Sequence, residues 1–395
     1  MTTALAYHRG MNLAATLDLA TAAHAEWDVL VVGAGPAGSV TARELARLGS
    51  RVLLVDQAAF PRRKVCGACL IQRGVDTLGR IGLGDLAHRH GAVPLTTFQL
   101  SSRGWHASFP GLGGVALSRE ALDVALVDAA ISCGVHFLPE TLVRRHQSRA
   151  DCRAVQLQQH GANRTARARV MIAADGLGGM LLAHEPGMPE RVQSASRIGI
   201  GCTLAGEVCG YGPGTIFMSC GQAGYLGLVR VEDGRLNCAA ALDRAALRNA
   251  ANPGHLAAKL LTEAGLSVPN GLKHASWRGT VPLTRRLPRP WSHRLFVVGD
   301  AAGYVEPFTG EGMAWALASA VALAPIAHRA AKSWDRSYGQ AWQQQHYNYV
   351  RRRERFLRAA AEVLRHPLLS SALVALLARF PGLAGPIVRH LRSGD

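Results

Sequence analysis

The sequence has few lysines, few aromatic residues and no long apolar run. Only four of its 44 basic residues are lysines, so arginine carries most of the formal charge of +17. Aromatic side chains make up 6% of the chain, no run of Lys or Arg exceeds three residues, and no zinc-finger spacing occurs. These features argue against a nucleic-acid partner. The charge has two interpretations: a GC-rich genome that writes Arg for Lys, or an anionic partner such as a phosphorylated cofactor or a membrane surface.

No stretch has the composition of a membrane-spanning helix. The longest segment without a charged residue, 208–229, holds six glycines and one proline. The more helical uncharged stretches, 312–327 and 366–378, are shorter than the roughly 18–20 apolar residues of a span, so we expect none. The N-terminus does not resemble a secretory leader. We therefore expect a cytoplasmic protein whose eight cysteines are free thiols.

A glycine-rich turn near the N-terminus carries the first specific signal. Residues 33–38, Gly-Ala-Gly-Pro-Ala-Gly, follow a buried strand predicted over 27–32 and precede a helix over 39–48 and a strand over 51–55. In such a unit the first glycine makes the turn, the second lets a pyrophosphate approach the backbone, and the third permits close helix packing. An acid after the second strand can accept ribose hydroxyls. The expected dinucleotide-binding residues are Gly33, Gly35, Pro36, Ala37, Gly38 and Asp56.

Two later motifs favour FAD as the dinucleotide. An Asp-Gly pair follows a strand predicted over 167–174, and a Gly-Asp pair follows another over 294–298. Next, the segment 307–313 opens a helix whose dipole favours negative charge on a reduced flavin ring. The aspartate at 300 is expected to hold the ribityl chain. The further cofactor-binding residues are Asp175, Gly299, Asp300, Pro307, Gly310, Gly312 and Met313.

Together these motifs resemble the FAD-dependent class A monooxygenase superfamily, which includes geranylgeranyl reductases and flavin halogenases. The resemblance covers about residues 27–330, and it implies that Arg119 steadies the FAD phosphates. It also links Asp175 to FAD and pyridine-nucleotide contacts, although Gly179 and Leu182 replace a Ser and an Arg often found there.

Within the superfamily, residues 60–67 and 299–314 are similar to the geranylgeranyl-reductase-like subgroup, which includes enzymes that tailor phenolic polyketide lipids. That likeness implies that Lys64, Cys66 and Gly67 run beside the flavin ring.

Few side chains are candidates for catalysis. Cys66 and Cys69 form a Cys-x-x-Cys pattern with three interpretations: a flavin-lining residue, which is favoured, a small core residue, or a redox disulfide. Glu306 is the one acid nominated near the ring, and the favoured alternative is a solvated loop carboxylate. No histidine falls in a recognisable relay, and no metal site is expected.

The predicted fold is α/β. A Rossmann-like FAD-binding lobe of the p-hydroxybenzoate-hydroxylase type is joined to an antiparallel-sheet substrate lobe and a helical C-terminal region. The expected boundaries are a loosely ordered tail at 1–25, a discontinuous FAD-binding domain at 26–75, 112–180 and 280–330, a substrate domain at 76–111 and 181–279, and a helical region at 331–395.

The favoured function is a monooxygenase of secondary metabolism that uses FAD, NAD(P)H and O2 to hydroxylate an apolar aromatic or polyketide-like substrate. The alternative is a reductase of C=C bonds, but the Tyr-x-Trp-x-Phe-Pro segment usual in that family is absent at 223–230. Halogenation ranks lower because 277–282 is not the Trp-x-Trp-x-Ile-Pro motif. A third hypothesis is a non-catalytic FAD-binding module on a membrane or carrier partner.

The C-terminal segment 351–395 is basic, with nine arginines against three acids, interspersed with leucine clusters. Basic amphipathic helices can lie on anionic membranes, so one expectation is peripheral membrane contact and a membrane- or carrier-presented substrate. The favoured alternative is a helical cap over the substrate lobe with a solvated basic face.

Overall fold

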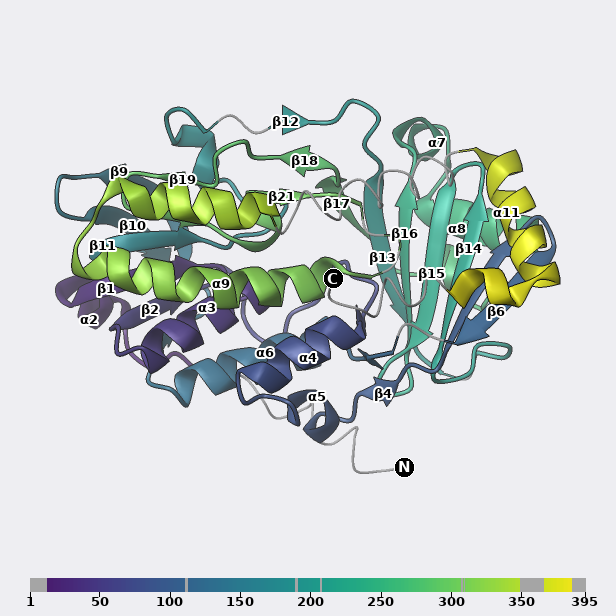
Figure 1. Ribbon diagram of the computed structural model, residues 1–395, viewed down its shortest axis with the longest axis horizontal. Helices are drawn as coiled ribbons and strands as arrows, with labels where there is room; N and C mark the ends of the chain where they lie inside the picture. Colours follow the sequence, from purple (N-terminus) through teal and green to yellow (C-terminus); the bar gives the residue numbers. More distant parts are fainter. Residues whose placement is uncertain are drawn as a thin grey trace.

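The computed structural model describes residues 13–110, 113–188, 191–206, 208–306, 308, 310–348 and 366–385. Figure 1 shows two lobes side by side, each built on its own sheet. In the first lobe the strand order is β19-β20-β11-β1-β2-β8, with β10 and β9 added at β11, and the pairs from β20 to β8 are parallel. The bounds are β1 Glu26–Val32, β2 Val52–Val55, β8 His136–Leu138, β9 Leu142–Ser148, β10 Arg153–Gln159, β11 Ala162–Ala173, β19 Trp291–Ser292 and β20 Leu295–Val297.

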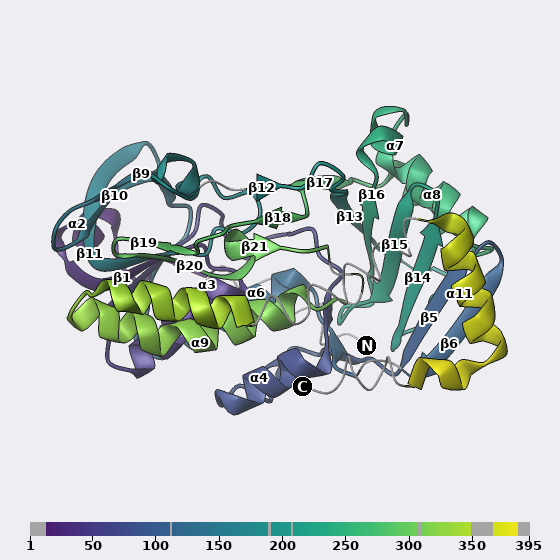
Figure 2. The same ribbon diagram turned by 45° about the horizontal axis from the view of Figure 1, so that its top comes forward.

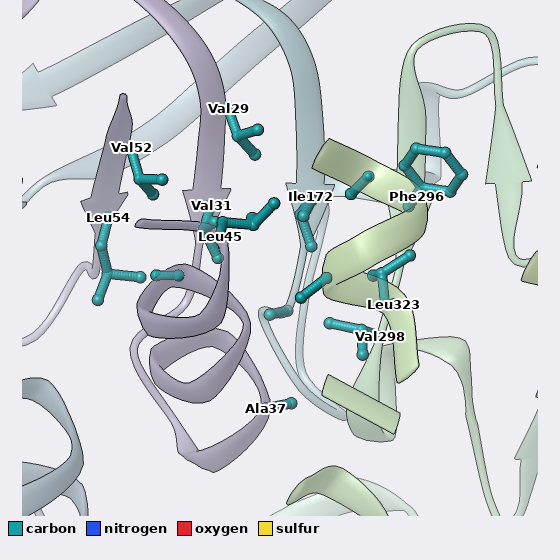
Figure 3. Close-up of a cluster of buried hydrophobic side chains, with 14 of the residues drawn as sticks. Val29, Val31, Ala37, Leu45, Val52, Leu54, Ile172, Phe296, Val298 and Leu323 are labelled. Atoms are coloured by element: carbon teal, nitrogen blue, oxygen red, sulfur yellow. The ribbon is translucent and has the colours of Figure 1, made fainter. Parts of the chain in front are cut away.

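Three helices cover one face of this sheet: α3 (Pro36–Arg47), α6 (Arg119–Ile131) and α9 (Gly312–Lys332). Buried parallel strands read as continuous apolar runs, and β2 is buried at all four positions. Figure 3 shows Leu45 of α3 and Leu323 of α9 packed against valines and leucines of the strands. Ser118 caps α6, accepting a hydrogen bond from the Ala121 amide at 3.1 Å.

The helix α2 (Leu19–His24) packs on the opposite face of the same sheet, so residues 13–25 are not a loose tail. Leu19 and Ala22 are buried in the core there, and Asp18 caps the helix by accepting from the Thr21 amide at 2.7 Å. The Thr16 hydroxyl accepts from the Phe137 amide at 2.8 Å. The predicted tail is therefore wrong for residues 13–25, while residues 1–12 lie outside the described residues.

The second lobe is a seven-stranded sheet with the order β17-β13-β16-β15-β14-β5-β6. All its pairs are antiparallel except β14 with β5. The bounds are β5 Thr97–Ser102, β6 Trp105–Pro110, β13 Ile198–Leu204, β14 Thr215–Gly221, β15 Gly224–Arg230, β16 Leu236–Leu242 and β17 Arg278–Pro282. Together the two sheets confirm the predicted α/β fold with a Rossmann-like FAD lobe and an antiparallel-sheet lobe.

Two helices cover opposite faces of this second sheet. Alternate side chains of a strand point to opposite faces. On β14, Phe217 packs with the helix α8 (Pro253–Glu263), whereas Met218 packs with the helix α11 (Pro367–Arg379). Figure 2 shows α11 running along β5 and β6. The face that carries Met218 also lines the interlobe cavity described below.

Two predicted boundaries differ from the structure. The helices α4 (Gln72–Arg80) and α5 (Leu86–Arg89), assigned to the substrate domain from residue 76, bury Leu78 and Leu86 against α6 and α9 of the FAD lobe. The C-terminal region is not one unit either. Residues 336–348 are helical on the FAD lobe, where the Trp342 indole donates to the Val297 carbonyl at 3.0 Å, while α11 lies on the substrate sheet.

Among the described residues, α9 is the one helix long and apolar enough to cross a membrane. In this structure 61% of its most apolar window is buried, against α3 and the parallel sheet. The apolar composition of α9 is explained by its position in the core of the FAD lobe.

Candidate active site

A cavity of about 600 Å³ lies between the two lobes. One side is formed by the glycine-rich turn, the loop 62–67, the Asp-Gly pair and the start of α9. The other side is the face of the second sheet that carries Met218. Most of the predicted cofactor-binding residues therefore meet in one place, although they come from segments up to 280 residues apart. Those that line the cavity are Gly33, Gly35, Pro36, Ala37, Asp56, Lys64, Cys66, Gly67, Arg119, Asp175, Asp300, Gly310, Gly312 and Met313.

Gly33 and Gly38 of the turn have the backbone roles that their spacing predicts. Gly33 has φ +101°, and a Cβ there would lie 2.3 Å from the Ala174 carbonyl oxygen. A Cβ on Gly38 would lie 1.8 Å from the Gly33 carbonyl oxygen, so only glycine lets α3 start this close to β1. Gly35 instead lines the cavity at the helix N-terminus, where an anion is favoured, and a Cβ there would meet only the guanidinium ends of Arg119 and Arg62.

Asp56 lies at the end of β2, on the cavity wall. Its Oδ2 accepts from the Ala34 amide at 2.8 Å and from Nη2 of Arg62 at 3.2 Å, and its Oδ1 accepts from the Ala58 amide at 3.0 Å. These bonds hold the carboxylate in place beside the glycine-rich turn.

Arg62 is a site residue that the sequence interpretation missed. It is buried, with Nη2 3.5 Å from the Asp123 carboxylate as well as bonded to Asp56. Its Nε and Nη1 are buried with no hydrogen-bond partner among the described residues. A Cβ placed on Gly35 would lie 3.7 Å from Nη2 of Arg62 and 3.5 Å from Nη2 of Arg119. Two guanidinium groups and two unused donors thus surround the point where a pyrophosphate would approach Gly35, which fits FAD.

Arg119 is held in this position by its own helix. Its Nε and Nη2 donate to the two carboxylate oxygens of Asp123 at 2.8 and 2.9 Å, one turn further along α6. Asp123 is fully buried and pairs with both arginines. The sequence signal for Arg62 was its place in the basic stretch 62–64, but only the tertiary structure shows which of those cations turns inward.

Lys64 and Asp300 line the same cavity. The pKa of Lys64 is lowered by burial and by the nearby charges of Arg62 and Arg119. Burial raises the pKa of Asp300 to about 6, against the opposing effect of Arg119 and Lys64. Lys64 is exposed and Asp300 is half-buried, and both are charged groups brought close together at the cavity.

The helix α9 begins at the cavity, as predicted for the flavin ring edge. Gly310, Gly312 and Met313 line it, and Glu311 precedes the first helical residue. Gly299 does not line the cavity. It has φ +66°, and a Cβ there would lie 2.7 Å from Cβ of Ala37, so it permits close packing against α3. Pro307 lies outside the described residues.

The two cysteines of the loop both line the cavity and are free thiols. Cys69 begins the short strand β3 (Cys69–Leu70) rather than a helix, and its Sγ donates to the Gly67 carbonyl at 3.2 Å. Burial raises the pKa of the Cys69 thiol far above its ordinary value. A redox Cys-x-x-Cys needs a readily ionised thiol, so this environment favours the flavin-lining interpretation.

Asp175 explains the departure from the superfamily pattern at Gly179. The Asp175 carboxylate accepts from the Leu181 amide at 3.3 Å, and a Cβ on Gly179 would lie 2.0 Å from its Oδ2. A serine at 179 would therefore displace the carboxylate from its present position.

Glu306 is buried rather than solvated, so the favoured alternative for this residue is wrong. Its carboxylate lies 3.2 Å from Nη1 of Arg197, which is itself buried and bonded through Nε to Asp243 at 2.9 Å. The Tyr225 hydroxyl donates to Glu306, and the Arg197 guanidinium lies 5.6 Å from the centre of the Tyr225 ring. Glu306 does not line the cavity; it is held behind Tyr225, which does. Sequence alone had no signal for Arg197.

The cavity wall formed by the second sheet is mainly apolar, and Tyr304 and Phe308, from the segment between Asp300 and α9, pack against it. Phe308 meets Tyr225 edge-on at 5.1 Å between ring centres and Phe98 at 6.3 Å. Burial, first of all, raises the pKa of Tyr225 and of Tyr304 well above the ordinary value, so both phenols keep their protons at neutral pH. The main apolar residues of this wall are Phe98, Ile216, Met218, Val229, Leu283 and Phe308.

A smaller, more polar recess adjoins the cavity. Arg63, Lys64, Cys66, Arg119 and Arg278 border both spaces. The side of the loop 63–66 that faces this recess is therefore cationic. In the part of the chain that the structure describes, no group of three or more His, Cys, Asp or Glu side chains could hold a metal ion.

Comparison with known proteins agrees with the geometry. A family model described as "FAD binding domain" matches residues 26–363. A menaquinone reductase of Mycobacterium tuberculosis (strain CDC 1551 / Oshkosh) is 41% identical over 116 residues, which is 28% of this chain and 28% of that protein, so the match spans under a third of the relative's length. Digeranylgeranylglycerophospholipid reductase 2 of Methanopyrus kandleri is 27% identical over 309 residues, covering 73% of each chain.

Solved structures with the same fold are flavin enzymes. The flavin-dependent halogenase CmlS superposes with a TM-score of 0.69 at 22% identity, covering 86% of this chain and 63% of the other. The halogenase PltM in complex with phloroglucinol and FAD gives 0.73 at 17% identity, covering 93% and 85%. At these identities the likeness shows the fold alone. Together with the family match and the geranylgeranyl lipid reductases, it confirms the predicted resemblance to the class A monooxygenase-like superfamily with FAD as cofactor.

Proposed function

This chain belongs to the FAD binding domain family, and from that membership we propose that it is an FAD-dependent reductase that saturates a carbon–carbon double bond of an apolar, isoprenoid-type molecule. The observation that carries the proposal is the cavity wall formed by the second sheet, which is largely apolar and has Tyr225, Thr280 and Arg278 as its polar side chains. An elongated hydrocarbon gains by leaving water for such a wall. The relatives that are named as reductases, of menaquinone and of a geranylgeranyl lipid, support this substrate class.

The titratable groups of that wall suit a reaction that takes up a proton. Saturating a C=C bond adds a hydride to one carbon and a proton to the other. Reduced FAD, when bound, supplies the hydride. The phenols are protonated at neutral pH, and no histidine or glutamate occurs among the described residues that line the cavity. We assign proton donation to Tyr304, which lies close to Asp300 and Cys66, with the proton recovered from water.

The cationic side of the loop 63–66 suits the reductant. NAD(P)H carries phosphates, and Arg63, Lys64 and Arg278 border the recess that adjoins the cavity. We propose that these residues position the phosphates of NAD(P)H while it reduces the flavin. Arg278→Ala is then expected to raise the KM for NAD(P)H severalfold with FAD content unchanged, because Arg278 lies across the recess from the FAD lobe. An unchanged KM would remove the recess from the proposal.

Hydroxylation with O2, the favoured prediction from the sequence, is the second candidate. The observation that favours it is the aromatic character of the wall around Phe308, which suits an aromatic substrate. A non-catalytic FAD-binding module is the third.

Anaerobic single turnover separates these functions. The FAD-loaded protein is chemically reduced without oxygen and mixed with a geranylgeranyl lipid or a menaquinone. The reductase predicts flavin reoxidation and a product heavier by two hydrogens, both of them deuterium when the solvent is D2O, because the N5 hydrogen of a reduced flavin exchanges with solvent. Tyr304→Phe is expected to slow this step at least tenfold, and Tyr225→Phe, whose hydroxyl is bound to Glu306, much less. Turnover only with O2 and an oxygenated product would establish hydroxylation instead. No turnover of any candidate would favour the module.

A further inference from the structure

The outward side of the C-terminal helix is apolar. The helix α11 and the turn η4 (Pro381–Ala384) pack on the second sheet through Val374, Leu377 and Ala384. Their other side carries large apolar side chains, and the intervals of seven and four residues from Leu369 through Leu376 to Phe380 place these three on one helix face. The members of this outer stripe and their exposed fractions are Leu368 70%, Leu369 55%, Leu376 47%, Phe380 55% and Leu383 52%.

The exposure is concentrated rather than scattered. Eleven large hydrophobic residues are exposed in the described part of the chain, and five of them fall within residues 368–383. Single exposed apolar residues are normal, whereas a contiguous stripe marks a surface that another body covers. In the described part of the molecule no element packs over the outer stripe, as Figure 2 shows for α11 at the edge of the second lobe.

The charge of the C-terminal segment indicates what covers the outer stripe. In the sequence, residues 351–395, which contain the outer stripe, carry nine arginines against three acids in a protein of net charge +17; of these arginines, Arg379 lies among the described residues. Apolar side chains bordered by arginine are typical of helices that lie in the interface of an anionic membrane. A second protein copy would bring the same positive charge against itself. At 13 residues, α11 is only about 20 Å long and too short to span a bilayer.

We propose that the outer stripe of α11–η4 docks the protein peripherally on an anionic lipid bilayer. The helix lies on β5, β6 and β14, whose residues Phe98, Ile216 and Met218 line the cavity on the same face of the sheet. Docking therefore holds the second lobe, with its cavity wall, at the lipid bilayer, in which an isoprenoid-type substrate dissolves. That purpose rests on the proposed function, whereas the docking itself does not.

Vesicle flotation of the FAD-loaded protein tests the docking without any substrate. Vesicles of phosphatidylcholine alone are compared with vesicles that also contain phosphatidylglycerol, at low salt. We expect binding to the anionic vesicles, and at least a tenfold loss of affinity in the double variant Leu376→Ser/Phe380→Ser. The matched control is Leu48→Ser/Val192→Ser, which removes two apolar residues of similar exposure elsewhere and is expected to bind like the wild type.

Several outcomes would overturn the proposal. Absence of wild-type binding, or equal binding by the Leu376→Ser/Phe380→Ser variant, removes the membrane as partner. Equal binding to neutral and anionic vesicles refutes the electrostatic part. If that variant loses FAD or melts at a lower temperature, the stripe is covered by the protein's own chain. If it converts a dimer to a monomer, a second copy is the occupant. Turnover of the wild-type protein in detergent does not depend on docking, so failure here is distinct from failure of the reductase.

Discussion

The glycines and charged side chains around the FAD site affect binding through short-range contacts. Gly35 is the clearest case because its Cβ position is open in the protein alone, with the nearest atoms 3.5 Å away, and its φ of −80° suits any residue. The apoprotein can accept a side chain there, but a pyrophosphate and a side chain cannot share the space.

Gly35→Val is therefore expected to abolish FAD binding and leave the fold intact. We expect at least a tenfold weaker affinity, about 1.4 kcal/mol or more. Flavin fluorescence titration measures the affinity, and circular dichroism of the apoprotein checks the fold. Wild-type affinity in this variant would show that the phosphates do not pass Gly35.

Replacing Asp300 is expected to weaken the binding of FAD but, at high pH, to stabilise the apoprotein. Asp300→Ala removes a charge-assisted hydrogen bond to the ribityl chain and is expected to weaken FAD binding by about 1.5–3 kcal/mol. An affinity within twofold of wild type would show that Asp300 does not contact the cofactor.

The pH dependence of the apoprotein follows from the raised pKa. The pKa of Asp300 is about 6 in the folded chain against an ordinary 3.8, so its contribution to stability is full at low pH and lost as the pH rises through about 6. Asp300→Asn removes that loss. Calorimetry should show that the stability of Asp300→Asn relative to wild type increases from about pH 4 to about pH 8. The same stability difference at both pH values would exclude a raised pKa of Asp300.

The cysteines of the loop should behave unequally. Cys66→Ser is expected to shift the flavin absorbance and lower NAD(P)H-driven turnover, while Cys69→Ser, whose thiol is buried and resists ionisation, should do much less. The visible spectrum and turnover of each single variant measure this. Equal damage from both would restore the disulfide interpretation, because disulfide exchange needs both sulfurs.

At the scale of elements, the connection from β1 to α3 determines where the helix N-terminus lies. Gly38 lets the first turn of α3 pass over the Gly33 carbonyl, with a would-be Cβ only 1.8 Å from that oxygen. This contact involves backbone, which cannot move aside without shifting the whole helix.

Gly38→Ala is consequently expected to lower both FAD affinity and the free energy of unfolding, the latter by about 2 kcal/mol or more. Urea unfolding of the apoprotein measures it. Gly79→Ala in α4 is the matched control, since no atom lies within 4 Å of its Cβ position, and it should stabilise by about 0.5–1 kcal/mol. A stable Gly38→Ala apoprotein would show that α3 can move freely.

At the scale of the whole molecule, buried charges tie the two lobes together. Arg197 precedes β13 of the second sheet, and Glu306 precedes α9 of the FAD lobe. Both are almost fully buried, so removing one partner leaves the other as an uncompensated charge.

Arg197→Met is expected to lower the free energy of unfolding of the FAD-loaded protein by about 3–5 kcal/mol, and adding Glu306→Leu should recover part of the loss. Arg244→Met, an exposed arginine nearby, should change it by less than about 1 kcal/mol. Denaturant titration of the wild type, Arg197→Met, Glu306→Leu, the double variant and Arg244→Met measures these differences. Additive losses in the double variant would mean that the pair does not couple the lobes.

What the sequence determined by itself is the local part of the FAD site. Short segments of sequence predict the glycine-rich turn with its flanking strands and helix, Asp56 and the start of α9. They do so because turn geometry and hydrophobic periodicity depend on neighbours along the chain. The resemblance to the FAD-dependent superfamily follows from the same segments, and the family match confirms it.

Only the tertiary structure decided what those segments meet. It turned Arg62 inward to Asp56 and Asp123, placed Arg197 against Glu306, and paired β5 with β14 to make the apolar wall. It also packed residues 13–25 on the parallel sheet and left one side of α11 exposed. These outcomes depend on contacts between residues far apart in sequence, and no local pattern specifies which buried charge finds which partner or which apolar helix face remains uncovered.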